Sequence, residues 1–401
     1  MDPLVRPLSP PLASLFSLFI RWQLHYSNAR VDRQSLYPEL HLGSHWLYHT
    51  NTMDTNEKTL FDKRYDKSHM IDTIDSFNVQ CREAIGLGKG FAFSSEEQID
   101  KVVICGMGGS AMAGDVARRF AKVPVMVNRS YTLPSFADSR TLLVAISYSG
   151  NTAETISSLR DGIEKGLQAL CIASGGKIEQ IAQENDIPFL QVPSGFQPRV
   201  ATGYLALPLI VILSRLDLVA RADQWDDMYA ALGKVKAECE ASVPLHDNPA
   251  KELARALHGH IPIIYGTANN TDLVAMRFKT QINENAKQPA YWNAFSELNH
   301  NEILALVRSD LLKNQHIVLL KNSYDHPENR IRMEIMTELF DEHHVPHSAV
   351  SAQGETELAQ ILSQIYFGDY VSYYLALANK LDPTPVELIE KFKQTLAERV
   401  S

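Results

Sequence analysis

A glycine-rich loop is the first place in this chain where residue types and spacing suggest chemistry. The loop, Gly106–Ala111, reads GMGGSA and directly follows the apolar run Lys101–Cys105. Glycines let the backbone approach a ligand, and free N–H groups at a helix N-terminus attract an anion. The loop fits the G-x-G-x-x-A form of the dinucleotide fingerprint. However, residues 128–130 (NRS) supply no acid for a ribose hydroxyl, and the GK[ST] ending of a P-loop is missing. The pattern favours an anion site; the alternative is a tight turn from strand to helix.

A second loop, Ser147–Thr152, reads SYSGNT and follows the apolar run Thr141–Ile146. Ser147, Ser149 and Thr152 place three hydroxyls beside a glycine where a helix is expected to begin. Such a loop can hold a phosphate without any cationic side chain. A helix N-cap would explain one of these hydroxyls, but not all three. Because open α/β sheets bind ligands at the C-terminal ends of their strands, two such loops at adjoining strand ends predict a phosphate site.

The elements that position these loops are predicted by short apolar runs that alternate with amphipathic stretches from about residue 70 onward. Runs that are apolar on both faces and separated by helices are typical of a parallel sheet covered on both sides. The pattern restarts after a polar helical stretch near residues 222–250. We therefore expect an α/β fold with two αβα domains and parallel sheets. The expected strands are 101–105, 124–127, 141–146, 167–173, 189–192, 261–265, 316–320 and 348–350, and the expected helices are 71–85, 111–120, 152–165, 202–216, 271–287, 328–343 and 355–380.

Length and composition limit the class of protein. A chain of 401 residues suits two domains, and its 45% apolar and 21% charged residues are typical of globular proteins. The 38 Lys and Arg against 47 Asp and Glu give a net charge of −9, which argues against nucleic-acid binding, since phosphates require a basic surface. The chain has no CxxC pair, and we expect its cysteines to be reduced, mostly buried thiols of a cytoplasmic protein. They are Cys81, Cys105, Cys171 and Cys239.

The first 52 residues are rich in Pro, Leu, Ser, His and Tyr and differ from the rest of the chain. Their apolar run, 12–20, is nine residues long, whereas a span of a bilayer takes about 20. They also lack the basic region and cleavage site of a signal peptide. We therefore expect no membrane partner. Residues 1–69 are interpreted as a partly disordered N-terminal extension, with Met53 as a hypothetical true start, followed by a first domain at 70–230 and a second at 231–401.

The motifs together resemble a known family. The GGS sequence ending at Ser110, followed by the SYSGNT loop, is similar to the sugar isomerase (SIS) domain, a phosphosugar-binding flavodoxin-like unit. Segments of the second half sharpen the resemblance, which points in combination to the bifunctional phosphoglucose/phosphomannose isomerases and extends from about residue 70 to the end. These segments are 283–287 (NENAK), 297–303 (ELNHNEI), 368–372 (GDYVS) and 382–387 (DPTPVE).

The resemblance implies a reversible conversion of glucose 6-phosphate, and of mannose 6-phosphate, into fructose 6-phosphate through a cis-enediolate. Such a reaction needs a phosphate site, a carboxylate base, an acid/base that opens the sugar ring, and a cation beside the enediolate. It needs no cofactor and no metal. The family pattern assigns the phosphate to the hydroxyl loop and the sugar end to the glycine loop. The implied substrate-binding residues are Ser147, Ser149, Thr152, Gly108, Gly109 and Ser110.

The implied catalytic residues lie mostly in the second half. Glu284 resembles the base that transfers the proton, and His300 resembles the histidine that opens the ring. An imidazole titrates near neutrality, so it can both donate and accept a proton during ring opening. Arg199 resembles the cation placed against the enediolate. The family also uses a C-terminal lysine, for which Lys393 is preferred over Lys391 because the family's lysine usually follows a large apolar residue. Without the resemblance, an exposed helix glutamate and a surface loop arginine would be the ordinary interpretations.

The resemblance also implies a homodimer, in which His300 belongs either to its own site or to that of the partner subunit. A metal is not expected. Three histidines, His343, His344 and His347, lie close together, but their place before a proline and a strand indicates a solvated helix end, where basic side chains suit the helix dipole.

Two other functions remain open at this point. One is a SIS-fold sensor that binds a sugar phosphate and regulates another process without catalysis. Such sensors usually carry a DNA-binding helix-turn-helix, and residues 1–70 show no basic recognition helix. The other is a different phosphosugar isomerase, acting on a pentose, heptose or amino-sugar phosphate. Those isomerases lack the string from Asn283 to Ile303.

Overall fold

The computed structural model describes residues 57–95, 98–220 and 223–400, which all belong to one compact unit. Residues 1–52 and the hypothetical start at Met53 lie outside the described residues. The described part of the predicted extension contains α2 (Glu57–Leu60) and the 3-10 helix η1 (Lys63–Tyr65). Leu60 and Phe61 are buried in the main hydrophobic core, so this segment packs against the folded protein.

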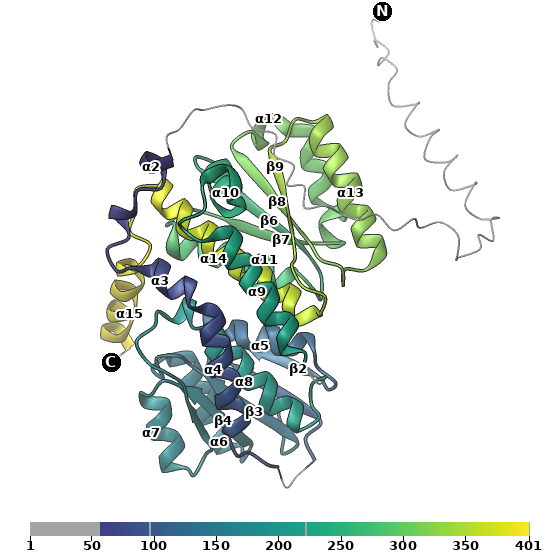
Figure 1. The fold of residues 1–401 in the computed structure, drawn as a ribbon. Helices are drawn as coiled ribbons and strands as arrows, with labels where there is room; N and C mark the ends of the chain where they lie inside the picture. Colours follow the sequence, from purple (N-terminus) through teal and green to yellow (C-terminus); the bar gives the residue numbers. More distant parts are fainter. Residues whose placement is uncertain (1–56, 96–97, 221–222, 401) are drawn as a thin grey trace, which may run out of the picture. The chain divides into compact units, whose positions relative to one another are not determined.

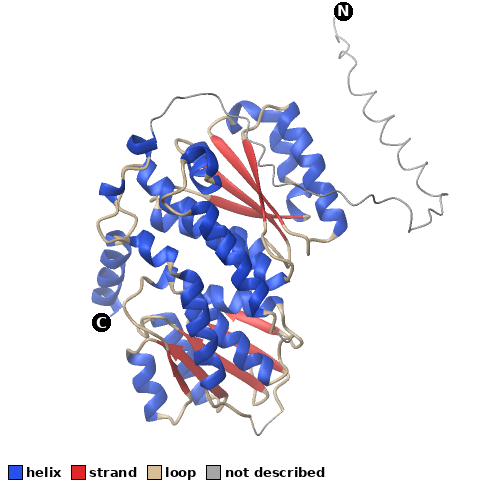
Figure 2. Ribbon diagram, viewed as in Figure 1, coloured by secondary structure: helices blue, strands red, loops and turns tan. Residues whose placement is uncertain are grey.

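The first sheet has five parallel strands in the order β2-β1-β3-β4-β5 (Figure 1, Figure 2). This is the doubly wound order of flavodoxin-like proteins. The strands are β1 (Lys101–Cys105), β2 (Val125–Asn128), β3 (Thr141–Ile146), β4 (Gln168–Ala173) and β5 (Phe189–Gln191). The expected fold class is confirmed for this half of the chain.

Helices cover both faces of the first sheet. Alternate residues of a strand point to opposite faces, and Val102 and Ile104 of β1 enter the main core, whereas Val103 and Cys105 enter a second one. Three helices form the main core with the first face: α4 (Phe77–Gly90), α5 (Gly109–Arg119) and α8 (Thr202–Arg215). Two others cover the opposite face: α6 (Ala153–Glu164) and α7 (Lys177–Glu184).

The second sheet has four parallel strands in the order β7-β6-β8-β9. They are β6 (Ile261–Thr267), β7 (Tyr291–Phe295), β8 (Gln315–Lys321) and β9 (His347–Ser351). One face packs in the main core with α9 (Trp225–Cys239), α10 (Pro249–Leu257), α11 (Asp272–Asn285) and α14 (Glu357–Ala378). The other face packs against α13 (Pro327–Glu342). Both halves are therefore α/β units with parallel sheets.

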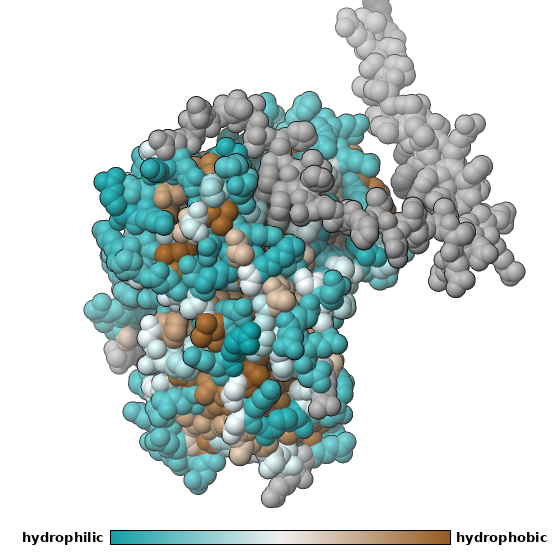
Figure 3. Space-filling model, viewed as in Figure 1, coloured by the Kyte–Doolittle hydropathy of each residue, from teal (hydrophilic) through white to brown (hydrophobic). Residues whose placement is uncertain are grey.

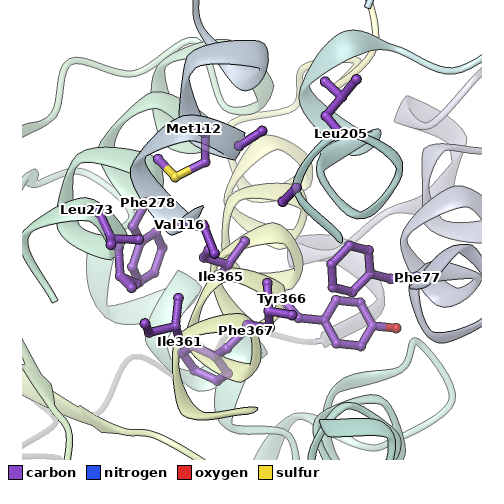
Figure 4. Close-up of a cluster of buried hydrophobic side chains, with 14 of the residues drawn as sticks. Phe77, Met112, Val116, Leu205, Leu273, Phe278, Ile361, Ile365, Tyr366 and Phe367 are labelled. Carbon is purple, nitrogen blue, oxygen red and sulfur yellow. The ribbon is translucent and has the colours of Figure 1, made fainter. Parts of the chain in front are cut away.

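The two sheets share one hydrophobic core. Figure 4 shows Met112 and Val116 of α5, which covers the first sheet, in the same cluster as Phe278 of α11 and Ile365 of α14, which cover the second. Helix α14 is buried from Leu358 to its end, as expected for a helix that is apolar all round. The loops that α5 and α11 carry are consequently fixed relative to each other by packing.

Polar and apolar residues are unevenly distributed over the surface, and the cysteines lie in the interior. On the face drawn in Figure 3, hydrophilic residues cover most of the second half, and apolar residues gather over the helices of the first sheet. The four cysteines are buried, as predicted. Within the described ranges, none of the helices has both the length and the apolar character needed to cross a membrane.

Several elements differ from the predicted ones. The expected helix 71–85 is two helices, α3 (Met70–Asp75) and α4, which meet at Ser76. Helix α7 and strand β7 are not predicted at all. Strand β7 lies at the edge of its sheet and exposes its first two residues, so it lacks the buried apolar run by which the other strands are found. The remaining predicted elements have bounds within a few residues of those observed.

Candidate active site

The glycine loop and the hydroxyl loop lie side by side. The first leads from β1 into α5 and the second from β3 into α6, and β1 pairs directly with β3. The backbone N–H of Tyr148 donates to Ser110 Oγ at 3.1 Å, which joins the two loops. The structure thus brings the two predicted loops together at adjoining C-terminal strand ends.

The hydroxyls of the second loop form a cluster at the start of α6. Ser147 Oγ and Thr152 Oγ1 lie 2.9 Å apart. Ser147 is fully buried and Ser149 is exposed. Thr152, the N-cap residue, makes no side-chain hydrogen bond to its helix, so its hydroxyl does not occupy the N–H groups of the first turn. A helix N-terminus surrounded by hydroxyls is a site for a phosphate group.

Glycines allow the close approaches that these loops require. At Gly150 φ is +67°, and a Cβ would lie 1.7 Å from the carbonyl oxygen of Gly175. At Gly109 a Cβ would lie 2.8 Å from the carbonyl oxygen of Pro198. Gly108 differs: a Cβ there would meet no atom within 4 Å. The glycine loop therefore packs tightly on Pro198 and leaves open space above Gly108.

The same loops are tied to the segment that carries Arg199. The Tyr148 hydroxyl donates to the carbonyl of Pro193 and accepts from the N–H of Phe196, both at 2.9 Å. Three residues later, the 3-10 helix η2 (Pro198–Val200) places Arg199 next to the glycine loop. Arg199 thus adjoins the predicted phosphate site, although many residues separate them in the sequence.

Arg199 is almost completely buried, with 2% of its surface exposed. Its Nε donates to Asn285 Oδ1 at 2.7 Å, and its Nη2 donates to the carbonyls of Pro383 and Thr384 at 3.0 and 2.7 Å. Its Nη1 lies 3.9 Å from Glu284 Oε2. Burial lowers the pKa of Arg199, which the charge of Glu284 opposes. The structure therefore brings two of the four predicted catalytic residues together.

Glu284 lies in the last turn of α11, with 27% of its side chain exposed. Close to it is Lys287, which was not among the predicted site residues. Its Nζ donates to the carbonyls of Asn285, Asp382 and Pro383 at 3.2, 2.6 and 2.9 Å. Burial, and to a smaller extent the positive charge of Arg199, lowers the pKa of Lys287 to about 8. Its position in the NENAK segment was the signal for it, but a sequence does not show which cations share a site.

His300 lies at the other end of the second sheet. It ends the 3-10 helix η4 (Glu297–His300), which follows the C-terminal end of β7, and it is exposed. Glu284, by contrast, lies in the last turn of α11, which returns to the start of β7, where Gln288 donates to the carbonyl of His260 at 2.6 Å. The five residues of β7 separate the two ends by roughly 16 Å at the usual rise per residue. Within one chain, Glu284 and His300 are not brought together.

The two candidate lysines lie on α15 (Glu387–Val400), and both are exposed. The segment before α15 is held at the site, because Arg199 and Lys287 donate to its carbonyls. No contact among the described residues joins Lys391 or Lys393 to Arg199 or Glu284. The structure therefore attaches the base of α15 to the site without bringing either lysine into it.

The corresponding edge of the second sheet is filled by a carboxylate. Asp325, with 3% of its surface exposed, follows β8. It accepts hydrogen bonds from Asn270 Nδ2 at 2.7 Å, from the N–H of Asn322 at 3.0 Å and from the Thr267 hydroxyl. Burial raises the pKa of Asp325. The Thr267, Asn270 and Asn322 donors, which would suit an anion, are thus already occupied by a carboxylate of the protein itself.

The histidines at the end of α13 were interpreted as a solvated turn, and His343 and His344 are exposed there. His347 is half-buried, and its Nδ1–H donates to the carbonyl of Val345 at 2.9 Å. Among the residues that the structure describes, no group of three or more His, Cys, Asp or Glu side chains is arranged to hold a metal ion.

Known proteins resemble this chain over most of its length. Residues 246–396 match the model of the bacterial phospho-glucose isomerase C-terminal SIS domain. The bifunctional phosphoglucose/phosphomannose isomerase of Caldicellulosiruptor bescii is 41% identical over 336 residues, which cover 82% of this chain and 99% of that protein. The enzyme of the same name from Thermoplasma acidophilum is 36% identical over 298 residues, covering 74% of this chain and 89% of that protein.

A solved structure shows the same fold. The C-terminal domain of glucosamine-fructose-6-phosphate aminotransferase from Francisella tularensis superposes with a TM-score of 0.61 at 18% identity, covering 80% of this chain and 99% of that domain. At this identity the likeness concerns the fold alone, and that fold is the expected SIS type. The sequence matches are closer and span both sheets, and they show that the chain belongs to the family of bifunctional phosphoglucose/phosphomannose isomerases.

Proposed function

We propose that this protein catalyses the reversible isomerisation of glucose 6-phosphate and of mannose 6-phosphate to fructose 6-phosphate. The observation that carries this proposal is the Arg199–Glu284 pair. A buried guanidinium and a partly exposed carboxylate lie 3.9 Å apart, and the arginine adjoins a loop suited to phosphate. A cation and a base beside an anion site are the groups that an enediolate reaction requires. The names of the relatives in this family support the same reaction.

The phosphate is assigned to the hydroxyl loop. Ser147, Ser149 and Thr152 donate to its oxygens, together with N–H groups at the start of α6. The sugar end lies along Gly108, Gly109 and Ser110, where the open space above Gly108 gives room for the carbon chain. A substrate held in this way extends from the hydroxyl loop past Pro198 toward Arg199, because the glycine loop packs on Pro198.

Glu284 is assigned the proton transfer between C1 and C2. It removes the C2 proton of the open-chain aldose and returns a proton to C1, and Arg199 stabilises the negative charge that develops on the enediolate. Glucose and mannose 6-phosphate give the same enediolate, because C2 loses its stereocentre. Rotation about C2–C3 then presents either face to the base, so one site suffices for both sugars. No step of this scheme requires a metal or a cofactor.

The site is completed by a second copy of the chain. His300, assigned to ring opening, lies at the opposite end of the second sheet from Glu284, so we assign it to the site of the partner subunit. The surface beside it is apolar: Leu304, Val307 and Leu311 are 71%, 80% and 61% exposed. Exposed apolar side chains that are gathered in this way mark an interaction surface. We therefore propose a homodimer that buries this surface.

The active-site lysine is assigned to α15, with Lys393 preferred over Lys391. Leu388 and Phe392 of this helix are 82% and 66% exposed, and an amphipathic helix is stabilised by burying its apolar face. Docking of α15 in the dimer, or on the substrate-bound site, would bring a lysine toward Arg199. Separate Lys391→Ala and Lys393→Ala variants identify which lysine is required.

The remaining assignments follow from this function. Residues 70–230 form the phosphate-binding SIS domain and residues 231–401 form the second, which includes the family-model match at 246–396. The protein is assigned to the cytoplasm, where its buried thiols stay reduced. Its substrates are hexose 6-phosphates, and neither a nucleic acid nor a membrane is expected as a partner.

A coupled assay on EDTA-treated protein tests the proposal. Fructose 6-phosphate formation is followed from glucose 6-phosphate and, separately, from mannose 6-phosphate. Turnover of both sugars supports the bifunctional activity without a bound metal. Activity that disappears with EDTA and returns with a divalent cation would contradict the metal-free scheme. Binding of the sugar phosphates without turnover would favour a sugar-phosphate sensor instead.

A further inference from the structure

The environment of Arg199 contains a second layer of buried polar residues that the proposed mechanism does not use. Asn285, the residue after the proposed base, is completely buried. Its Oδ1 accepts from Arg199 Nε at 2.7 Å, and its Nδ2 donates to Ser372 Oγ at 2.9 Å. The Ser372 hydroxyl donates in turn to the carbonyl of Asp369 at 2.9 Å. Each donor in this chain has its acceptor, so the orientation of the Asn285 amide is fixed.

A second contact holds the backbone of Arg199. Arg277, with 1% of its surface exposed, donates to the carbonyl of Arg199 through Nη2. The same nitrogen lies 3.4 Å from Asp369 Oδ1, to which Gln281 also donates. Arg277, Gln281 and Asn285 all belong to α11, the helix that carries Glu284. One helix therefore holds the base directly and the cation through its buried face.

These hydrogen bonds engage the Nε–Nη2 edge of the Arg199 guanidinium and leave Nη1 for contact with a substrate. Nε is engaged by Asn285, and Nη2 by the carbonyls of Pro383 and Thr384. Among the residues that the structure describes, Nη1 has only a long contact of 3.4 Å to Gln197 Oε1 and lies 3.9 Å from Glu284 Oε2. A guanidinium anchored along its Nε–Nη2 edge is held in its plane, so that Nη1 points in a constant direction.

From this geometry we infer that Asn285 is a positioning residue for the isomerisation, which acts by aiming Arg199 Nη1 at the enediolate. The inference rests on the proposed function. Fixed donors stabilise a transition state better than mobile ones, because no energy is spent in orienting them at the moment of reaction. A displacement of about 1 Å of such a group reduces the rate by as much as about 100-fold. Asn285 does not touch the reacting carbons in this scheme.

The alternative is that Asn285 only stabilises the fold, and a double-mutant cycle separates the two roles. Asn285→Ala is expected to lower kcat by about 10- to 100-fold in both reactions, with KM changed less than about 3-fold. In an Arg199→Lys background the same change is expected to cost less than about 3-fold, because lysine has no Nε edge to anchor and residues that act as a unit are not additive. A purely structural role would reduce activity by the same factor in both backgrounds.

Asn379→Ala is the matched control. Asn379 is half-buried and bonds the same end of α11, donating to the carbonyl of Ala286 at 3.2 Å, but it does not touch Arg199. Its kcat is expected to remain near that of the wild type. If Asn285→Ala does not fold, Asn285→Ser replaces it, because serine keeps a buried polar partner for Ser372 but is too short to reach Nε.

The outcomes separate this inference from the proposed function. A wild-type protein without isomerase activity would overturn the proposed function. An active wild type whose Asn285→Ala variant keeps its kcat, or loses activity equally with and without Arg199→Lys, would overturn only the positioning role of Asn285.

Discussion

Replacement of Glu284 by glutamine tests the assignment of the base, because it removes the proton acceptor and little else. Glutamine has nearly the same shape as glutamate, but its amide does not accept a proton at neutral pH. We expect kcat for both hexose 6-phosphates to fall by about 10²- to 10⁴-fold, the usual contribution of a general base. At 1.36 kcal/mol per tenfold change, this loss corresponds to about 3–5 kcal/mol of barrier.

The structure indicates that the fold should tolerate this change. The Glu284 side chain is 27% exposed and its Oε2 lies 3.9 Å from Arg199 Nη1, which is a long separation for an ion pair. The four other hydrogen bonds of the guanidinium, to Asn285, Pro383, Thr384 and Gln197, do not involve Glu284. Because these four hydrogen bonds remain, loss of the long Arg199–Glu284 contact should leave the protein folded and lower Tm by only a few degrees.

The assay measures kcat and KM for both aldoses, together with exchange of the C1 hydrogen of fructose 6-phosphate with D₂O. KM should stay within about 3-fold of the wild type, because phosphate binding does not use Glu284, whereas deuterium incorporation should fall with kcat. Glu334→Gln, an isosteric change at an exposed position of α13, is the control. If Glu284→Gln retains wild-type turnover or exchange, another group is the base and the Arg199–Glu284 pair is structural.

Three further predictions concern the phosphate loop, the dimer and stability. Gly150→Ala would place a Cβ 1.7 Å from the carbonyl oxygen of Gly175, at a residue whose φ is +67°. The change should therefore raise KM at least about 10-fold or lower Tm, as measured by kinetics and calorimetry. Unchanged values of both KM and Tm would contradict the loop geometry. The Glu284→Gln and His300→Ala variants should each be inactive, but refolding them together should recover about a quarter of wild-type activity. Half of the dimers are then mixed, and each mixed dimer contains one intact site out of two. No recovery would place His300 in the site of its own subunit. Burial, and to a smaller extent the charges of the nearby histidines, lowers the pKa of His316 from 6.5 to about 3. Between pH 7.5 and 5 only the unfolded chain therefore binds a proton at this residue, and the wild type should lose about 2 kcal/mol more of its free energy of unfolding than His316→Gln does. Equal losses in the two proteins would refute this prediction.

The strands and loops of the first half could be predicted because local patterns determine them. β1 and β3 are short runs that are apolar on both faces, and each is followed at once by a loop with glycines or hydroxyls. A parallel doubly wound sheet then places consecutive strand ends at one edge. The contact between Tyr148 N–H and Ser110 Oγ is a detail of that arrangement, and the juxtaposition itself was predictable from the order of the elements.

The arrangement of the second half could not be predicted in the same way. Glu284 and His300 are sixteen residues apart in the sequence, but they lie at opposite ends of β7. This edge strand has an exposed start, so it lacks the buried apolar run that indicates a strand in the sequence. Because β7 was not predicted, the sequence left open whether His300 acts in its own site or in that of the partner subunit. Lys287 was missed for a similar reason, since its backbone acceptors at Asp382 and Pro383 come from a segment almost a hundred residues later.

The two sheets have different tasks, and the buried polar residues explain why one site needs both. The first sheet offers an open anion site, whereas the equivalent edge of the second is occupied by the buried carboxylate of Asp325. The second sheet contributes instead through the far end of α11, where Glu284 lies and where Asn285 bonds Arg199. Because Arg199 comes from a loop of the first sheet, the cation and the base meet only while α5 and α11 stay packed in their shared core. A substitution that loosens this core, such as Phe278→Ala, should therefore reduce kcat even under conditions in which the variant is still folded.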